Sequence, residues 1–170
     1  MTTESVAPEV LHVWAVYLRA CEEARRRGDR RTGTEHLLLA LLEDPSIEVV
    51  LGVSLQQARQ TLESLDQQAL GALGLGSRTD APPIPMRAVP KKPRIRDVIK
   101  KDRLRMTPSA KKVLEDAVKP NRRKTQVMAQ QVLAQILTRQ PPDPAAVLLG
   151  ALGVDPSEVR RRLDAVTPDR

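Results

Sequence analysis

Aromatic residues are almost absent from this sequence. Trp14 and Tyr17 are the only two, and the 170-residue chain contains no Phe. The 41% of residues that are hydrophobic are therefore mainly Leu, Val, Ile and Ala, and a core built from these residues favours helices. This hydrophobic content is sufficient for a folded core in one domain or in two small ones.

Two further absences exclude whole classes of protein. The single cysteine, Cys21, cannot form an internal disulfide and cannot make a thiolate metal site alone, so we expect it to be buried in the core. No apolar run approaches the roughly 20 residues that a membrane span requires, and no signal-peptide pattern opens the sequence. We therefore expect a cytoplasmic protein that does not associate with membranes.

Residues that could support catalysis are scarce as well. His12 and His36 are the only imidazoles, no His-Glu-x-x-His spacing occurs, and Cys21 lies in an apolar stripe that disfavours its thiolate. The nearest approach to a phosphate-binding loop, GALGLGSR at 71–78, ends in Ser-Arg where such a loop requires Lys followed by Ser or Thr. We predict no enzymatic activity, no metal site and no cofactor.

Positive charge is concentrated in one segment. Residues 86–105 contain nine Lys or Arg and two Asp, so this segment alone carries the net charge of +7 that the whole chain has. Gly and Pro recur over residues 71–93, which predicts a flexible, partly extended connector. The chain is thereby divided into a first segment at 1–70, a Pro/Gly-rich and then basic linker at 71–105, and a second segment at 106–170.

The two segments that flank the linker are similar to each other, as the copies of an internal repeat are. TEHLLLALL at 34–42 aligns with AQQVLAQIL at 129–137, and aliphatic residues recur at equivalent positions. GVSLQQARQTLE at 52–63 aligns with GVDPSEVRRRLD at 153–164. Nine residues separate the two blocks in the first copy and fifteen in the second, so we expect the third helix of the first copy to be shorter by more than a turn.

Helix signals accompany these blocks. Ser54 and Asp155 are good N-cap residues, each with Gln or Glu three positions later, and Thr107 before a proline predicts another helix start. Gly28 ends an apolar stripe at helical spacing. The stripe comprises Val10, Val13, Trp14, Tyr17, Cys21 and Ala24. No strand is predicted, and we expect an all-α fold of two pseudo-symmetric four-helix repeats joined by the basic linker.

Both halves resemble a known family. ACEEARRRGDRRTGTEHLLLALLEDPS, followed by GVSLQQARQTLE, is similar to the first repeat of the N-terminal domain of Clp-type unfoldases, closest to ClpC, and MTPSAKKVLEDAV with GVDPSEVRRRL is similar to the second. The resemblance covers residues 10–65 and 105–166. It implies a double four-helix repeat that recruits substrates and adaptor proteins to the unfoldase ring, and it implies a stand-alone domain because the ATPase modules have no counterpart in this sequence.

The resemblance also implies a ligand site at the junction TGTEH. ClpC-like domains recognise phosphorylated arginine, so we predict Thr34, Glu35 and His36 as ligand-binding residues. Glu35 would pair with a guanidinium group through charge-assisted hydrogen bonds. The equivalent positions at 129–131 read Ala-Gln-Gln, which leaves Glu35 as the only acid for this role. The alternative is structural, with Thr34 as an N-cap and Glu35 stabilised by the helix dipole.

The basic linker is a second candidate surface. Its predicted partner-binding residues are Lys91, Lys92, Arg94, Arg96, Lys100 and Lys101. We expect them to dock on an acidic protein surface. The alternatives are a solvated spacer and salt-dependent nucleic-acid binding, although the linker lacks aromatic residues that would stack on bases. If the two repeats pack face to face, we also expect an apolar groove between them, bounded by Leu38, Leu42, Leu133 and Leu137.

Together these features predict a non-enzymatic protein-binding module of the Clp protease system. Its partners would be Clp unfoldase or protease subunits, or substrate and adaptor proteins. Three roles stay open: an adaptor, an accessory subunit, or a decoy that sequesters substrates or inhibitors. The alternative function is that of a nucleic-acid-binding or regulatory protein that uses the basic linker.

Overall fold

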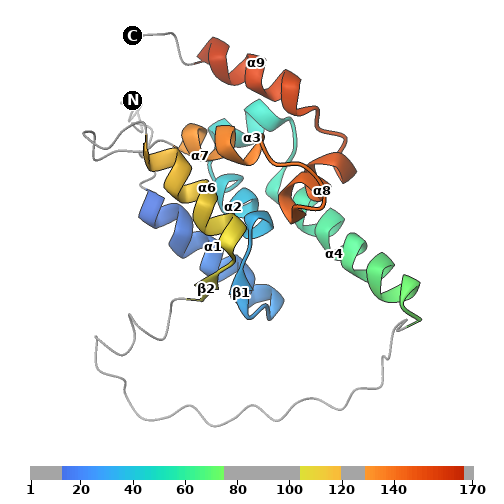
Figure 1. Cartoon of the computed structure of the whole chain (residues 1–170). Helices are drawn as coiled ribbons and strands as arrows, with labels where there is room; N and C mark the ends of the chain where they lie inside the picture. The colour runs from blue at the N-terminus through green and yellow to red at the C-terminus, as the bar shows by residue number, and fades with distance from the viewer. Residues whose placement is uncertain (1–12, 75–103, 120–128, 167–170) are drawn as a thin grey trace, which may run out of the picture.

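The computed structural model describes residues 13–74, 104–119 and 129–166. Over these ranges it contains eight helices, four from each repeat, and the prediction of an all-α double repeat is confirmed (Figure 1). Repeat 1 contains α1 (Val13–Arg27), α2 (Thr34–Leu41), α3 (Pro45–Leu51) and α4 (Leu55–Ala72). Repeat 2 contains α6 (Pro108–Val118), α7 (Ala129–Ile136), α8 (Pro144–Ala151) and α9 (Pro156–Val166). The domain boundaries placed at residues 70 and 105 stay a prediction.

Several helices begin and end where the capping signals predict. The Ser54 hydroxyl accepts a hydrogen bond from the Gln57 amide at 3.2 Å at the start of α4. Thr107 does the same for the Ala110 amide at 3.2 Å at the start of α6. Gly28 follows α1 with φ of 81°, the left-handed conformation in which glycine has no steric cost.

The extra residues of repeat 2 lie mainly in a loop and not in its third helix. α3 has seven residues and α8 has eight, so the predicted shortening of α3 by more than a turn is wrong. Residues 42–44 connect α2 to α3, whereas the longer segment 137–143 connects α7 to α8. A loop tolerates such an insertion because its closure entropy rises only slowly with length.

The sequence patterns do not predict a short parallel ribbon that joins the two repeats. β1 (Arg31–Thr32) pairs in register with β2 (Arg105–Met106), and the Thr107 amide donates to the Thr32 carbonyl at 2.9 Å. The prediction that no strand occurs is therefore wrong. Two residues are too few to display the alternation that identifies a strand in a sequence. The ribbon brings the starts of α2 and α6 side by side (Figure 1).

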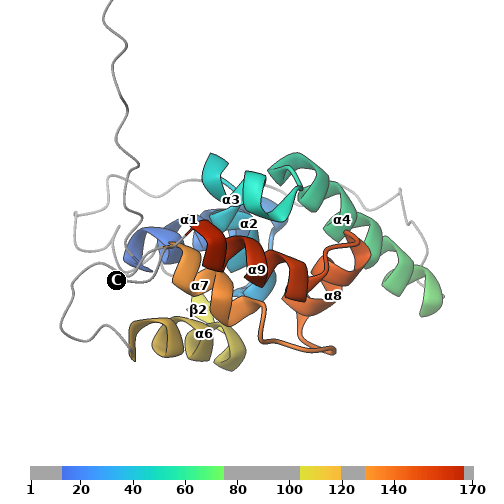
Figure 2. The same cartoon turned by 90° about the horizontal axis from the view of Figure 1, so that it is seen from above.

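Both repeats share one hydrophobic core. α2 contacts α1 and α4 of its own repeat and α6, α7 and α8 of the other, and α9 contacts α7 and α3 (Figure 2). The leucines expected to bound a groove are Leu38, Leu42, Leu133 and Leu137. All four are at most 3% exposed, so the predicted groove between the repeats is instead filled core. These four leucines belong to the single core cluster that both repeats form.

The apolar stripe predicted on α1 only partly matches its buried face. Cys21 is buried as expected, and Val16 and Ala20, which the stripe leaves out, are fully buried. Trp14, which was placed in the stripe, is 48% exposed. Val10 lies outside the described residues. The exposed side of Trp14 is therefore available to form a surface feature.

Candidate functional site

The predicted ligand residues lie where β1 leads into α2. Gly33 is the N-cap, in an extended conformation with φ of −98° and ψ of −177°, and Thr34 is the first helical residue. The hypothesis that Thr34 caps the helix is therefore wrong. A β-carbon at position 33 would collide with the carboxylate of Glu35. In this conformation the Glu35 carboxylate folds back over the Gly33 backbone, so a larger residue at position 33 would displace that carboxylate.

The Thr34 hydroxyl makes a contact between the repeats. It donates to Asp143 Oδ1 at 2.6 Å and accepts a hydrogen bond from the Ala145 amide at 3.3 Å. Asp143 is the N-cap of α8 and also accepts a hydrogen bond from the hydroxyl of Ser109 on α6. Since Thr34 is 1% exposed, its hydroxyl serves the junction of α2, α6 and α8.

His36 is a second buried link at this helix start, with 1% of its surface exposed. Its Nδ1 accepts a hydrogen bond from the Gly33 amide at 3.0 Å, and its Nε2 lies 2.9 Å from Asp29 Oδ2. Because Nδ1 is the acceptor, Nε2 carries the proton and donates it to Asp29. Burial disfavours the Asp29 carboxylate, but the charge of Arg27 and the hydrogen bonds from Arg27 and His36 outweigh burial and lower its pKa.

Glu35 is the least enclosed of the three predicted residues. Its side chain is 16% exposed, and its Oε1 lies 3.2 Å from His36 Nδ1, which already accepts the Gly33 amide. Its Oε2 is buried and accepts no hydrogen bond from any described residue. A buried carboxylate oxygen without a donor is costly. This oxygen therefore has an unused capacity to accept a hydrogen bond.

The equivalent helix start in repeat 2 lacks these groups. Ala129 is the first residue of α7 and is buried, so no hydroxyl is present to make the contact that Thr34 makes. Gln131, at the position of His36, has a buried Oε1 without a hydrogen-bond partner among the described residues. Only repeat 1 therefore presents a carboxylate at this position. The ligand-binding role of Thr34, Glu35 and His36 itself stays a prediction.

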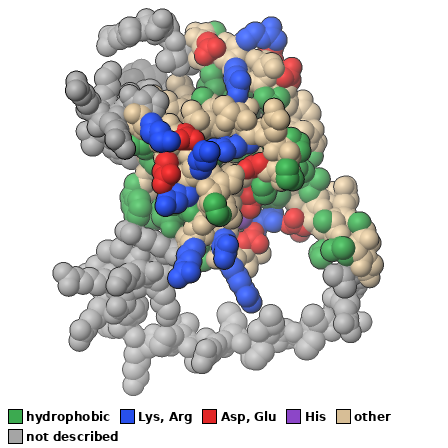
Figure 3. Space-filling model, viewed as in Figure 1, with side chains coloured by type: hydrophobic (Ala, Val, Ile, Leu, Met, Phe, Trp, Pro, Cys, Tyr) green, Lys and Arg blue, Asp and Glu red, His purple; other side chains and the backbone are tan. Residues whose placement is uncertain are grey.

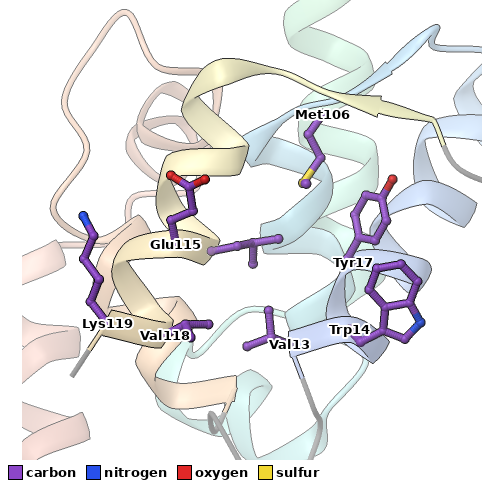
Figure 4. A pocket seen from close by; sticks show the side chains of 8 residues that line it. Val13, Trp14, Tyr17, Met106, Glu115, Val118 and Lys119 are labelled. Atoms are coloured by element: carbon purple, nitrogen blue, oxygen red, sulfur yellow. The ribbon is translucent and has the colours of Figure 1, made fainter. Parts of the chain in front are cut away.

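A second candidate site is a mostly apolar cleft between α1 and α6, with a volume of about 490 Å³ (Figure 4). Its lining residues are Val13, Trp14, Tyr17, Met106, Leu114, Glu115, Val118 and Lys119. The ring centroids of Trp14 and Tyr17 are 5.3 Å apart, and the Tyr17 hydroxyl donates to the Leu104 carbonyl at 2.8 Å. These contacts hold the aromatic wall in place. Glu115 and Lys119 add one charge of each sign on the α6 wall.

Nothing in the sequence patterns predicts this cleft. Trp14 and Tyr17 lie three residues apart, so they share one face of a helix. That spacing fits a buried stripe and an exposed aromatic surface equally well. The tertiary structure distinguishes the two, because it buries Tyr17 and leaves Trp14 48% exposed. The pairing of the chain's only two aromatic residues is the signal that points to the site.

The other sequence predictions concern the cysteine, metal sites, membrane helices and the basic linker. Cys21 is 1% exposed with its Sγ 3.4 Å from Thr32 Oγ1, which agrees with a buried core residue. In the described ranges, no group of three or more His, Cys, Asp or Glu could hold a metal ion. None of the helices described is long and apolar enough to cross a membrane. The six linker cations predicted to bind partners lie outside the residues that the structure describes.

Comparisons with known proteins agree with this architecture. The family model for the Clp repeat (R) N-terminal domain matches residues 11–125, more than half of the chain. No curated protein matches. The chain is similar to the crystal structure of the N-terminal domain of the caseinolytic protease associated chaperone ClpD from Arabidopsis thaliana, with a TM-score of 0.61 and 18% sequence identity.

That match covers 96% of this chain and 97% of the ClpD domain. An identity this low shows the fold alone, and the family assignment depends on the family model. The chain belongs to the Clp repeat (R) N-terminal domain family, whose domains are protein-interaction modules of the Clp system.

Proposed function

We propose that this chain is a non-enzymatic protein-binding module of the Clp protease system and that the α1–α6 cleft receives an apolar segment of a partner protein. The exposed apolar lining of this cleft is the observation that carries the proposal. Trp14 is 48% exposed beside Val13 and Met106, and Trp and Met are enriched at protein interfaces. Trp is also among the residues that contribute most to binding energy.

The partner would be a Clp unfoldase or protease subunit, a substrate or an adaptor, met in the cytoplasm. The 170 residues contain no phosphate-binding loop, so this chain would act by binding and not by unfolding. It would serve as an adaptor, as an accessory subunit, or as a decoy that sequesters substrates or inhibitors. In each of these three roles the partner would bind in the same cleft. The roles differ in which other proteins the bound partner contacts.

Trp14 is the only tryptophan of the chain, which makes the cleft observable without a label. Titration of the full chain with a purified Clp unfoldase that has its tryptophans replaced by phenylalanine should shift the Trp14 emission to shorter wavelength as the ring becomes buried. Trp14→Ala removes the fluorophore, so its affinity is measured by calorimetry, and it should weaken the complex by at least about tenfold, the typical loss at a binding hot spot. A matched control is Val49→Ala on α3, because Val49 is 79% exposed and lies outside the cleft.

Failure of this proposal has a clear signature. Capture from native lysate with the tagged full chain should retain Clp subunits before and after nuclease treatment. Retention of nucleic acid alone, or of proteins that nuclease treatment releases, would favour the nucleic-acid alternative. Equal losses for Trp14→Ala and Val49→Ala would show that the cleft is not the binding surface.

At the start of α2, we further propose that Glu35 binds the guanidinium group of a phosphorylated arginine on a partner protein. The support is the buried Oε2 without a hydrogen-bond donor among the described residues, which a guanidinium N–H would satisfy through a charge-assisted hydrogen bond. Thr34 and His36 would then hold the helix start in place for Glu35.

A phosphoarginine peptide and its unmodified arginine counterpart distinguish this finer proposal. Calorimetry should show binding of the phosphorylated peptide, with Glu35→Gln weakening it by at least about tenfold. Gln130→Glu, which puts the same acid at the equivalent position of α7, is the reciprocal control. Equal affinity for both peptides, or for wild type and Glu35→Gln, would reject the role of Glu35.

A further inference from the structure

The β1–β2 ribbon places two arginines side by side. Arg31 in β1 is the register partner of Arg105 in β2. Side chains alternate between the faces of a strand, and here Thr32 is fully buried while Met106 lines the α1–α6 cleft. Arg31 and Arg105 therefore project together from the opposite, exposed face, with their strands about 4.8 Å apart.

Neither of these two arginines forms an ion pair with an acid in the part of the chain that the structure describes. The neighbouring Arg26 and Arg27 are each paired with an acid, but no ion pair there joins Arg31 or Arg105 to one. Like charges directly opposite each other in a sheet are destabilising. Figure 3 shows Lys and Arg side chains projecting over the ribbon. The register of the ribbon thus places two arginine residues directly opposite each other.

The backbone that holds them is firmly positioned. The Thr107 amide donates to the Thr32 carbonyl at 2.9 Å beyond the ribbon, and the Tyr17 hydroxyl donates to the Leu104 carbonyl at 2.8 Å before it. β2 is therefore fixed on both sides of Arg105. Because the ribbon fixes the two backbone positions, a single ligand can reach both exposed side chains at once.

We propose that Arg31 and Arg105 together bind carboxylates of an acidic segment in a partner protein. Each guanidinium presents a planar fork of donors that matches a carboxylate. The bound acid also removes the repulsion that the free chain retains. This site is distinct from the α1–α6 cleft, because Arg105 and Met106 point to opposite faces of β2.

A protein segment fits this patch better than a nucleic acid does. An extended nucleic-acid backbone requires a track of cations and aromatic side chains on which bases stack. The described patch has no aromatic side chain among its members, and Asp29 and Asp66 lie close by around Arg27.

Fluorescence anisotropy with labelled tetraglutamate tests the proposal, with tetraglutamine as the uncharged probe and the full chain as the protein. At about 0.15 M salt, which screens long-range attraction, tetraglutamate should bind and tetraglutamine should not. Arg31→Gln with Arg105→Gln should weaken tetraglutamate binding by at least about tenfold. Arg161→Gln removes the same type of charge from a side chain that is 75% exposed on α9, and it should leave binding within about twofold.

Thermal unfolding supplies an independent readout. Removal of the repulsion by Arg31→Gln or Arg105→Gln should raise Tm by about 1–3 °C, whereas Arg161→Gln should not raise it. Loss of binding together with higher stability in the ribbon variants supports the site. An equal loss of tetraglutamate affinity in Arg161→Gln would show that binding depends only on the net charge of the chain. Unchanged affinity in the ribbon variants would reject the site. If duplex DNA displaces tetraglutamate and its binding depends on Arg31 and Arg105 in the same way, the ligand of this site is a nucleic acid and not an acidic protein segment.

Discussion

The second helices of the two repeats, α2 and α7, have the same length of eight residues and begin in different ways. In α2, Thr34 bonds to Asp143 in the other repeat, and His36 bonds to Asp29 in the preceding loop. In α7 the equivalent positions hold Ala129 and Gln131, which cannot reproduce these bonds. The helices nevertheless bury their aliphatic side chains in the same core.

This comparison separates two kinds of similarity. The aliphatic positions of the repeat are interchangeable because hydrophobic burial depends on area and volume and has no direction. The polar residues in the first turn of α2 cannot be exchanged for those of α7, because a hydrogen bond requires a donor and an acceptor at the right distance and angle. The two repeats therefore share one fold, whereas only repeat 1 has these polar contacts at the start of its second helix.

The largest expected effect tests the part that the repeats share. Leu38→Ala and Leu133→Ala remove equivalent, fully buried side chains, and each should lower the free energy of unfolding by about 2–5 kcal/mol. Urea unfolding followed by circular dichroism and by Trp14 fluorescence should give one coincident transition, because the core is continuous. Separate transitions for the two probes would show that the repeats fold independently.

The next effect tests the junction that only Thr34 reaches. Asp143→Ala removes the N-cap of α8 and leaves the hydroxyls of Thr34 and Ser109 without their acceptor, which should cost about 2–4 kcal/mol. Asp44→Ala, at the equivalent N-cap of α3, removes bonds to Ser46 alone and should cost about 1 kcal/mol. Equal losses of stability in the two variants would show that the junction adds nothing to capping.

The third effect concerns an ion pair that joins the first and last helices of repeat 1. Glu23 on α1 is 3% exposed and pairs with Arg59 on α4, whereas no ion pair among the described residues joins α6 to α9. Arg59→Gln should lower the free energy of unfolding at pH 7 by about 1.5–3 kcal/mol, because the buried carboxylate then keeps only Arg26. Arg161→Gln on α9 is the matched control and should cost about 0.5 kcal/mol or less.

The same link makes stability depend on pH. Burial opposes ionisation of Glu23, but hydrogen bonds and charges from Arg59 and Arg26 outweigh it and lower its pKa. A lowered pKa stabilises the fold at neutral pH, and this contribution is lost as the pH falls below about 4.3, the ordinary pKa of glutamate. Arg59→Gln should therefore flatten the acid side of the stability profile. A profile as steep as that of wild type would contradict this account.

The smallest expected effect concerns Glu35 itself. Glu35→Gln copies the residue of repeat 2 and replaces a buried, unbonded carboxylate oxygen with a neutral amide. The free energy of unfolding should rise by about 0–1 kcal/mol in the absence of ligand, since the desolvation of a charge is relieved. Urea is the appropriate denaturant, because guanidinium chloride would supply the group that we propose Glu35 binds. A loss of more than about 1 kcal/mol would show that Glu35 has a structural role.

Much of the architecture could be predicted because its signals are local. Ser54 and Thr107 cap their helices through their own next turn, and Gly28 ends α1 through its own backbone conformation. The cleft could not be predicted, because the exposure of Trp14 depends on where α6 lies. The roles of Thr34 and His36 at the helix start were only partly predictable, since their partners Asp143 and Asp29 lie elsewhere in the chain.

By itself, the sequence determined that this protein is helical, that it is a double repeat, and that one copy lacks the polar hinge of the other. Those properties follow from spacing, capping and residue type, which act within a few turns of helix. Only the tertiary structure decided that the repeats share one core, that Trp14 lines a surface cleft, and that Arg31 lies beside Arg105. These depend on contacts between residues far apart in the chain, and no local pattern specifies which distant side chain will cover a given face.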